Sequence, residues 1–487
     1  MLVAIFNLSG FALFTSVKYQ ICFLLFLTLG CQTFKESPLL VLQEDSVTYK
    51  VDTAGFPYSS LLSREAVKHF YANRDFQLFW SSAGKIKPAA DSLLWIVAHA
   101  NRYGLIGEDY HAGDLDKLLL DTLASDRLPR VDLMLTDAYL TFYEHLQNGR
   151  LDSKTMQRRD LSLSVDHEAV AALKEADKIE HVRDLEMLEP GITQYQELKN
   201  ALGELLRAGK EKDSVLAKRA EMISLNMERW RWQNPWPRRY VYVNIPSFIM
   251  RAVEQDSVWL ESRIIVGKRE TPTPVMESVI RSFIIYPYWH APYSISTKEI
   301  LPALQRDASY LRRNNFEVLN RKGKIILSDT IQWDFYSANN FPFILRQREG
   351  SENSMGIIKF VFANNYNVYL HDTNSKRLYE RNRRDLSHGC VRVDRAVAFA
   401  HYLVREDDIY VSPEDLDQYL SLQQRLKIDL RKPIALKMEY FTAEVKDGVP
   451  FFYEDIYKKD SVMMQALIPS NPSGDLEGKI DLASGAH

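Results

Sequence analysis

The spacing of apolar residues changes once along this chain, at about Trp230, and this change limits the folds it can adopt. Before this point, stretches such as 89–103 and 131–146 place apolar side chains three and four residues apart, a spacing typical of amphipathic helices. After it, runs rich in β-branched and aromatic residues favour strands. We therefore predict an α+β protein, with a helical scaffold domain over 60–217 and a mostly β domain over 218–467.

Four runs of the second domain are predicted to be strands, and two of them are predicted to form a hairpin. Asn364 and Asn365 separate the last two runs and favour a tight turn. A helix over 397–404 is expected to follow, with Asp394 as its N-terminal cap. The predicted strands cover 240–245, 262–267, 359–362 and 367–371.

Residues 302–343 interrupt the strand pattern. A helix is predicted over 304–312, followed by a polar hairpin. We interpret the region as an insertion over 300–345 that caps the site of the β domain. The last segment, 468–487, is rich in Ser, Gly and Pro and is predicted to be a disordered tail.

The N-terminus carries an almost unbroken apolar run, Ile21 to Leu29, just ahead of Cys31. The run is too short to span a bilayer but suits the apolar region of a secretory signal, and it lacks the amphipathic period of a core helix. Small residues before a cysteine resemble a bacterial lipobox, in which the cysteine is acylated. We therefore expect a signal peptide with lipobox over 1–31, a linker over 32–59, and a periplasmic lipoprotein anchored to a membrane through Cys31.

The charge balance excludes broad electrostatic binding. With 61 basic and 64 acidic residues among 487, the formal net charge is only -3. Such a chain produces no strong field of either sign. Neither nucleic acid nor an anionic membrane surface is therefore predicted as a partner.

Cysteine usage points to one residue. Of the three cysteines, Cys22 would leave with the signal peptide and Cys31 would be acylated, so Cys390 would be the only free thiol of the mature protein. A single thiol in an exported protein cannot form an internal disulfide and is exposed to oxidation. A chemical role would explain why Cys390 is present.

The residues around Cys390 support a role as nucleophile. A thiol attacks a carbonyl as its thiolate, so it needs a base or a cation nearby, and His371 ends a predicted strand one loop earlier. The amides of Gly389 and Cys390 are candidate donors to a developing oxyanion, and Gly389 allows close approach of a substrate. Arg392 adds a fixed positive charge suited to a substrate carboxylate.

Each of these residues also has an ordinary interpretation, since a buried Cys, a strand-end His and a surface Arg are common structural features. A zinc site built from His371, Asp372, His388 and Cys390 is the alternative from another chemical class, although their spacing matches no known zinc pattern. We predict no metal and no cofactor.

The segment from Ser387 to Arg392, with His371-Asp372-Thr373 ahead of it, resembles the signature of YkuD-type L,D-transpeptidase catalytic domains. The resemblance extends to the larger YcbB-like branch over most of the chain. It rests on the segments 225–232, 243–246, 267–274, 286–289, 353–360 and 369–373, and more weakly on 70–110.

Two departures from that branch stand out. A small peptidoglycan-binding helical domain often separates scaffold and catalytic domain there, yet only a short stretch separates Leu202 from Met222 here. Tyr286 also stands where the branch usually has Asn. The first departure means that no separate glycan-anchoring module is expected.

The resemblance implies a donor peptide stem of peptidoglycan that ends in a diamino acid and D-Ala. Cys390 would attack the diamino-acid carbonyl while His371 accepts the thiol proton, and D-Ala would leave behind a thioester. An acceptor amine would then form the cross-link. Further expected roles are orientation of the imidazole by the backbone or side chain of Asp372, support of the loop by His388, carboxylate binding by Arg392 and Lys359, and shaping of the groove by Asn353, Tyr369 and Trp289.

Several outcomes remain open on the same site. Water as acceptor would give an L,D-carboxypeptidase, and a lysine of an envelope protein would give a wall-to-protein transferase. A non-catalytic peptidoglycan-binding lipoprotein is the alternative outside enzymology. Envelope thiol peptidases are disfavoured, because in those the Cys precedes the His in the chain.

Overall fold

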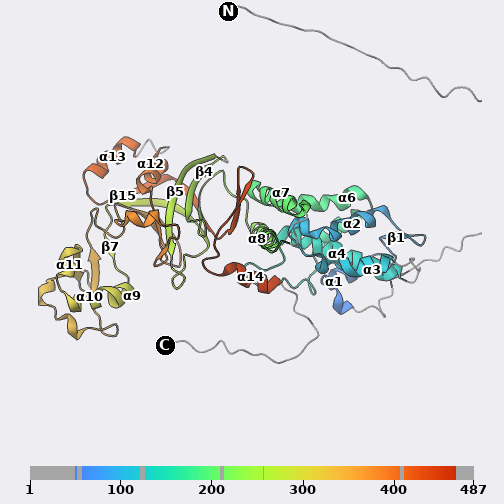
Figure 1. Cartoon of the computed structure of the whole chain (residues 1–487), viewed down its shortest axis with the longest axis horizontal. Coiled ribbons are helices and arrows are strands. Elements are labelled where there is room, and N and C mark those ends of the chain that lie inside the picture. Colours follow the sequence, from blue (N-terminus) through green and yellow to red (C-terminus); the bar gives the residue numbers. More distant parts are fainter. Residues whose placement is uncertain are drawn as a thin grey trace, which may run out of the picture. The chain divides into compact units, whose positions relative to one another are not determined.

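The computed structural model describes residues 50–51, 58–120, 127–208, 213–255, 257–405 and 411–467 (Figure 1). The predicted signal and lipobox at 1–31, with Cys31, and the predicted tail at 468–487 lie outside these residues. The predicted linker is described only at 50–51 and 58–59. Over the described ranges, no helix combines the length and the apolarity that crossing a bilayer would need.

The N-terminal part is helical and has its own apolar core. Its longest helix, α4, is buried along almost its whole length. Pro129 stands in the first turn of α4, where a helix needs no N–H donor, and Gly149, with a φ of +80°, ends it. The helices are α1 (Arg64–Ala72), α2 (Pro88–Ala98), α3 (Ala112–Leu120), α4 (Leu128–Asn148), α5 (His167–Glu175), α6 (Ile179–Arg183), α7 (Thr193–Arg207) and α8 (Ser214–Arg231).

The C-terminal part is built on a nine-stranded sheet in the order β13-β5-β14-β12-β11-β6-β15-β3-β4. Because β4 also pairs with β5, the sheet closes on itself around one apolar core. Its strands are β3 (Arg239–Asn244), β4 (Ile249–Glu254), β5 (Ser257–Gly267), β6 (Met276–Ile285), β11 (Ile358–Phe362), β12 (Leu370–His371), β13 (Asp385–Ser387), β14 (Val391–Val393) and β15 (Leu426–Glu439). The prediction of an α+β protein with a helical part followed by a mostly β part is confirmed.

An insertion between β6 and β11 forms a small sheet of its own, in the order β7-β10-β8-β9. A separate apolar core that includes Leu304, Trp333 and Phe341 holds it together. Its elements are β7 (Trp289–His290), α9 (Tyr293–Ile295), the π-helical turn η6 (Ser296–Ile300), α10 (Leu301–Arg306), α11 (Tyr310–Arg313), β8 (Phe316–Leu319), β9 (Ile325–Ile326) and β10 (Ile344–Gln347).

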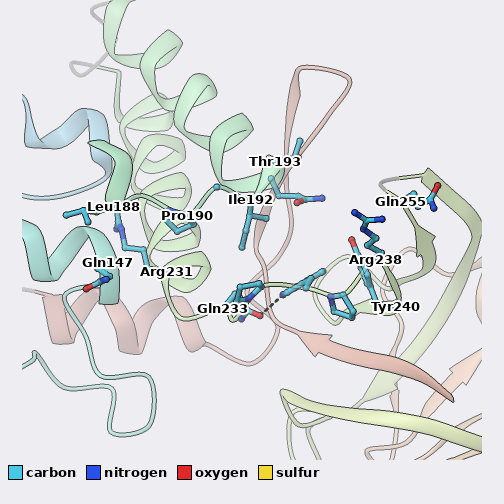
Figure 2. Close-up of a pocket in the computed structure, with 15 residues that line it drawn as sticks. Gln147, Leu188, Pro190, Ile192, Thr193, Arg231, Gln233, Arg238, Tyr240 and Gln255 are labelled. Carbon is cyan, nitrogen blue, oxygen red and sulfur yellow. Dashed lines mark hydrogen bonds between the residues drawn. The ribbon is translucent and has the colours of Figure 1, made fainter. Parts of the chain in front are cut away.

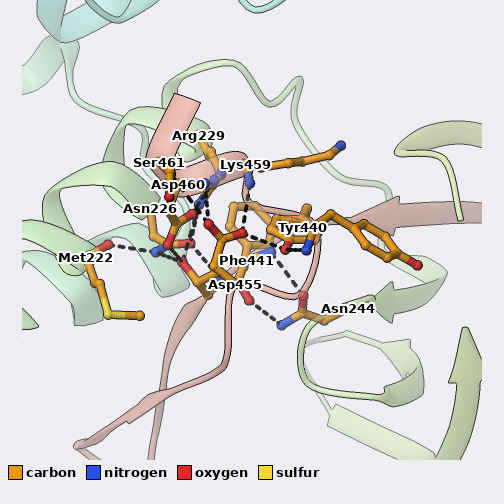
Figure 3. A network of polar contacts seen from close by, with 12 residues as sticks. Met222, Asn226, Arg229, Asn244, Tyr440, Phe441, Asp455, Lys459, Asp460 and Ser461 are labelled. Atoms are coloured by element: carbon orange, nitrogen blue, oxygen red, sulfur yellow. Dashed lines mark hydrogen bonds and ion pairs between the residues drawn. The ribbon is translucent and has the colours of Figure 1, made fainter. Parts of the chain in front are cut away.

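Helix α8 joins the helical part to the β part through a buried polar network (Figure 3). Asn226 accepts a hydrogen bond from the Thr442 amide and donates one to its hydroxyl, both 2.9 Å long. Arg229 pairs with Asp460 of α14 (Lys459–Leu467) at 2.6 Å, and Asp460 also accepts from Thr442 at 2.8 Å. Since these groups satisfy one another, their burial is tolerated and α8 is held in one register against the β part.

Most local predictions are confirmed, and the exceptions have identifiable causes. The strands at 240–245, 262–267 and 359–362 fall on β3, β5 and β11, displaced by at most a residue or so or lengthened. The helix at 89–103 is shorter than predicted, because α2 ends at Ala98 and a 3-10 turn, Ala100–Tyr103, completes the stretch.

Two predictions about helices were wrong. Helix α12 (Ala396–Val404) has Arg395 at its N-cap with no side-chain cap, because the Asp394 carboxylate pairs with Arg263 at 2.8 Å. The helix predicted over 304–312 is divided, since the backbone of Asp307 is extended, with a φ of -157°, between α10 and α11.

The hairpin is real but its turn is not tight. Strands β11 and β12 pair antiparallel, with Lys359 opposite His371, and a loop over 363–369 joins them. The side chain of Asn364 organises this loop, accepting from the amides of Tyr366 and Val368 and donating to the Val368 carbonyl. These hydrogen bonds from the side chain of Asn364 stabilise a longer loop in place of the predicted two-residue turn.

Candidate active site

Three of the predicted site residues project from one face of adjacent strands. On β12, His371 lies opposite Arg392 of the parallel strand β14 and opposite Lys359 of the antiparallel strand β11. Side chains alternate along a strand, and the neighbours Leu370 and Phe360 pack into the barrel core. The imidazole, the guanidinium and the ammonium therefore share the opposite face.

Cys390 directly precedes β14 and lies beside Tyr369, which directly precedes β12. The Val391 amide donates to the Tyr369 carbonyl (3.1 Å) and fixes this pairing. The Tyr369 hydroxyl hydrogen-bonds to the Cys390 sulfur and accepts from the Trp289 indole. The Lys359 ammonium lies 3.9 Å from the centre of the Tyr369 ring. A hydroxyl donor and a cation thus accompany the thiol.

The loop that carries Cys390 is held by close backbone packing and by a serine. A Cβ on Gly267 would lie 2.1 Å from the Thr271 carbonyl oxygen and 2.9 Å from Cα of Gly389, so only glycine fits there. Gly389 itself has a φ of +111°. The Ser387 hydroxyl accepts from the Gly389 amide (3.1 Å) and donates to the Cys390 carbonyl (2.5 Å).

Thr273 and Tyr457 also hold this loop, and neither was singled out from the sequence. The buried Thr273 hydroxyl donates to the Gly389 carbonyl (2.8 Å) and accepts from the Gly267 amide (2.9 Å). The Tyr457 hydroxyl donates to the Gly267 carbonyl (2.6 Å). The Thr-Pro-Thr-Pro run at 271–274 belongs to the segment 267–274 of the resemblance, but its distance from Cys390 in the sequence does not indicate this contact.

His371 is only 6% exposed, and this burial dominates its protonation. Burial, with the positive charges of Arg392 and Lys359, lowers the pKa of His371 to about 3, although backbone groups of Asp372 and Met355 favour the protonated form. Nδ1 is buried and has no hydrogen-bond partner among the residues that the structure describes. The imidazole is therefore neutral near pH 7 and can accept a proton.

The thiol of Cys390 is also neutral at rest. Burial raises its pKa, while hydrogen bonds from Tyr369 and the charges of Lys359 and Arg392 oppose that shift. No hydrogen bond joins Cys390 to His371 within the described ranges. The Tyr369 side chain contacts both residues. Its hydroxyl hydrogen-bonds to the Cys390 sulfur, and its ring centre lies 5.5 Å from that of the imidazole. A neutral thiol beside a neutral base is an arrangement in which proton transfer accompanies attack.

Lys359 and Arg392 are cations without counterions. Neither side chain pairs with a carboxylate in the described part of the chain, and Nε of Arg392 is buried without a hydrogen-bond partner. Burial lowers the pKa of both groups, and the Cys390 thiolate opposes the shift for both. Since burying an unpaired cation is costly, these two side chains are prepared for an anion.

Asp372 contacts the loop before β11, not the imidazole, with its side chain. Its carboxylate accepts from the Ile357 amide (3.1 Å) and pairs with Lys376. Gly356, with a φ of +59°, packs so closely that a Cβ there would lie 2.3 Å from the Asp372 carboxylate. The backbone of Asp372 favours the protonated form of His371, and the role of Asp372 in orienting the imidazole stays a prediction.

Asn353 and His388 hydrogen-bond to other segments, and neither bonds to the Cys390 thiol among the described residues. The Asn353 amide is buried and donates to the Pro287 and Arg348 carbonyls, while its oxygen accepts from the Met355 amide. Its polar atoms hold this loop and leave little for a substrate. His388 contacts Glu299 of η6 at 2.6 Å, which links the Cys390 loop to the insertion.

The two candidate oxyanion donors differ. The Gly389 amide already donates to Ser387, whereas the Cys390 amide donates no hydrogen bond within the described residues. The Cys390 amide is therefore the better placed of the two to receive a developing charge. For the zinc alternative, no group of three or more His, Cys, Asp or Glu side chains in the described ranges has the arrangement of metal ligands.

Comparison with known proteins gives two family matches. Residues 65–202 match the family model described as a scaffold domain, and residues 238–411 match the YkuD family model, described as the L,D-transpeptidase catalytic domain. A Haemophilus influenzae protein with the curated name "Putative L,D-transpeptidase" is 30% identical over 240 residues, which is 49% of this chain and 48% of that protein. The match thus spans about half the length of that relative.

Solved structures of low similarity were also found. The catalytic domain from an E. faecium L,D-transpeptidase acylated by ertapenem is 12% identical, covers 42% of this chain and 100% of that chain, and has a TM-score of 0.20. An L,D-transpeptidase from Mycobacterium smegmatis is 10% identical, covers 42% of this chain and 58% of that chain, and has a TM-score of 0.18. The narrower YcbB-like branch stays a prediction.

Proposed function

From the premise that residues 238–411 form a YkuD-family L,D-transpeptidase catalytic domain, we propose that this protein cross-links peptidoglycan stem peptides through a thioester on Cys390. The observation that carries the proposal is the set of side chains next to this thiol. A neutral buried imidazole and two cations that have no counterion in the described part of the chain share one face of the sheet beside it. This is the set that an acyl transfer from a carboxylate-bearing peptide requires.

The first half-reaction forms the thioester. The Cys390 sulfur attacks the carbonyl of the diamino acid, and His371 takes the thiol proton as the new C–S bond forms. The tetrahedral oxyanion lies against the Cys390 amide. When the C–N bond breaks, His371 returns the proton to the departing amine, and D-Ala leaves.

The second half-reaction releases the acyl group. The side-chain amine of a second stem attacks the thioester carbonyl, and His371 accepts a proton from that amine. The C–S bond then breaks and the sulfur regains the proton. The product is a cross-link with the acyl group on the acceptor nitrogen, and the free Cys390 thiol is restored.

Lys359 and Arg392 have two consequences in this scheme. Their positive charges favour the thiolate of Cys390 and oppose protonation of His371, so the base stays available. They would also bind the terminal carboxylate of the donor stem, which orients its last peptide bond. Tyr369 adds a hydroxyl that stabilises the thiolate.

Export and anchoring belong to the same proposal. A lipid at Cys31 would keep the enzyme on a membrane facing the peptidoglycan, in the periplasm. The N-terminal apolar run and the small residue before Cys31 support this location. Metabolic labelling with a fatty-acid analogue, compared between wild type and Cys31→Ala, tests it.

Intact-protein mass spectrometry tests the enzymatic proposal. The purified protein is mixed with a stem tetrapeptide, and an adduct equal to the tripeptide acyl group is expected on the wild type with D-Ala in solution. Cys390→Ala should give no adduct and His371→Gln a slow one, with the fold of each checked by circular dichroism. A folded wild type without adduct would leave a non-catalytic peptidoglycan-binding lipoprotein.

The acceptor is decided by the fate of the adduct. Transfer to a second stem supports cross-linking, because the product mass is that of a dimer lacking one D-Ala. A free tripeptide indicates an L,D-carboxypeptidase. Transfer to a protein lysine but not to a stem indicates a wall-to-protein transferase, and either of these two outcomes would replace the cross-linking proposal.

A further inference from the structure

A groove of about 870 Å³ lies between the helical part and the start of the β barrel, and it shares no residue with the Cys390 site (Figure 2). One wall is the start of α7, with Ile192 and Thr193. The other wall is the segment that leads from Arg231 at the end of α8 to Tyr240 in β3. Nothing in the reaction at Cys390 uses it.

The charge of the groove is one-sided. Among the 15 residues that line it there are two arginines and no Asp or Glu, in a chain with 64 acidic residues. In Figure 2, Arg231 and Arg238 lie toward opposite ends of the groove. Arg238 is exposed and forms no ion pair with the described residues. Arg231 is paired with Glu228 at 3.2 Å, so Arg238 is the lining cation that a ligand with negative charge would meet without a competing carboxylate among the described residues.

Arg231 supplies a donor that the protein itself does not use. Its side chain is fully buried and bonds with Glu228 and Tyr195 through its terminal nitrogens. Its Nε is buried without a partner among the described residues. Buried N–H groups are almost always paired, so an unpaired one that lines a groove indicates an acceptor from a ligand.

Helix α7 adds backbone donors. It has 15 residues, Ile192 at its N-cap provides no side-chain acceptor, and no acidic residue stands in its first turn. The N–H groups of that turn therefore carry uncompensated partial positive charge at the groove. Together with the Nε of Arg231, they form an anion-binding wall.

The remaining lining suits sugar rings. Trp236 presents an aromatic ring that is held by a hydrogen bond from its indole to Gln233 (3.1 Å) and by the Tyr240 ring at 4.9 Å. The side chains of Gln147, Gln194 and Gln255 form no hydrogen bond with the described residues, so their amides are free for hydroxyl and acetamide groups. A fixed aromatic ring with several free amides is typical of a pocket for a polar ligand with apolar faces.

We propose that this groove binds a glycan strand of N-acetylated sugars that carry carboxylates. The proposal rests on the proposed function for the source of that glycan, which is peptidoglycan. Binding here would hold the enzyme on a glycan strand while Cys390 acts on a stem. It would thus supply the anchoring for which the sequence predicts no separate module.

Titration calorimetry with three probes tests the proposal, using the purified protein with Cys390→Ala so that no turnover occurs. The probes are glycan strands freed of their stems, which keep a carboxylate on alternate sugars, neutral oligomers of N-acetylglucosamine, and free stem peptides. We expect the carboxylated strands to bind at least roughly tenfold more tightly than the neutral oligomers, and increasingly weakly as salt is added. Equal binding of neutral oligomers, or binding of the free stems alone, would overturn the assignment.

Two variants place the binding in the groove. Arg238→Glu should weaken the carboxylated strand by roughly tenfold or more, because it reverses a charge at one end. Gln194→Glu should weaken it too, although a carboxylate in the first turn stabilises helix α7. Loss of affinity in a variant with a raised melting temperature cannot be caused by unfolding.

A matched control and an independent readout complete the test. Arg130→Glu makes the same charge change on an exposed position of α4, roughly 25 Å along that helix from Gln147. It should leave the affinity unchanged. Acylation of an intact Cys390 by a free stem tetrapeptide should stay normal in Arg238→Glu and Gln194→Glu. If glycan affinity is unchanged in both variants while acylation stays intact, the assignment of glycan binding to this groove is overturned. The proposed enzymatic function would then still stand.

Discussion

His371 and Arg392 lie opposite each other on parallel strands, one a buried neutral imidazole and the other a guanidinium with no counterion among the residues that the structure describes. This arrangement allows His371 as a base and Arg392 as a cation to act on the same thiol, that of Cys390. The positive charge of Arg392 lowers the pKa of His371 and also opposes the rise in the pKa of Cys390. The same charge thus keeps the base deprotonated and favours the thiolate.

The first prediction concerns the reactivity of Cys390. Its alkylation by iodoacetamide should rise with pH, since only the thiolate reacts and burial raises the pKa of this thiol. Arg392→Gln and Lys359→Met each remove a charge that lowers that pKa, so both should move the midpoint of the rate profile to higher pH. The exposed Arg377→Gln serves as control and should not move it. Unchanged profiles in both site variants would contradict the electrostatic account.

The second prediction concerns Thr273, whose hydroxyl joins the Gly389 carbonyl to the Gly267 amide. Thr273→Val keeps the shape but leaves both buried groups unpaired, at a cost of about 1–3 kcal/mol each. We expect a lower melting temperature and, because the nucleophile loop loses its support, at least roughly tenfold slower acylation of Cys390.

Thr273→Ser provides the matched variant, since it keeps the hydroxyl and loses only a methyl group. It should restore acylation to near the wild-type rate. Thr330→Val, at an exposed 3-10 turn, removes a hydroxyl that donates to the Leu327 carbonyl at 2.8 Å and should have little effect. If the serine variant acylates as slowly as the valine variant, the hydroxyl is not what holds the loop.

The sequence alone predicted the elements whose pattern is local. Helix α4 followed from apolar residues three and four apart, and the strands β3, β5 and β11 followed from runs rich in β-branched and aromatic residues. The lone thiol and its preceding His were also visible, since their chemistry does not depend on packing. The roles of Cys390 and His371 stay predictions until acylation is measured.

The contacts that hold the site were not predictable, because they join residues far apart in the chain. Thr273 meets Gly389, and Trp289 meets Tyr369, only through sheet pairings that a single sequence does not specify. Asn353 is predicted to shape the groove, and the structure shows that its amide supports a loop by donating to the Pro287 and Arg348 carbonyls. Polar side chains can serve either purpose, and only their neighbours decide which.

The third prediction separates steric clash from backbone strain at Gly356. A Cβ there would lie 2.3 Å from the Asp372 carboxylate, at a φ of +59°. Gly356→Ala should therefore lower the melting temperature and slow acylation, because Asp372 follows His371 directly. Gly323→Ala has similar strain, with a φ of +77°, but no atom within 4 Å of its Cβ. Gly323→Ala should lower the free energy of unfolding by only about 1 kcal/mol. Equal losses of stability in Gly356→Ala and Gly323→Ala would exclude a steric clash at Gly356 as the cause.

The last prediction is a pH dependence of stability at Glu439, a carboxyl 4% exposed at the end of β15. Burial, and to a lesser extent the charge of Glu277, raise its pKa from 4.5 to about 7, against the opposing charges of Lys437 and Lys459. A raised carboxyl pKa contributes stability that is fully present below pH 4.5 and is lost as pH rises through 7. The free energy of unfolding of the wild type should thus fall as pH rises from 4.5 through 7.

Glu439→Gln removes the titration and keeps the hydrogen-bonding shape. The difference in melting temperature between Glu439→Gln and wild type should grow in favour of the variant from pH 4.5 to pH 8. The corresponding change in the difference of unfolding free energies is on the order of 2–3 kcal/mol. Glu270→Gln, at an exposed position, should show no such trend. A difference between Glu439→Gln and wild type that stays constant with pH would mean that Glu439 has the same pKa in the folded and unfolded chains. The positive charges of Lys437 and Lys459 would then fully offset its burial.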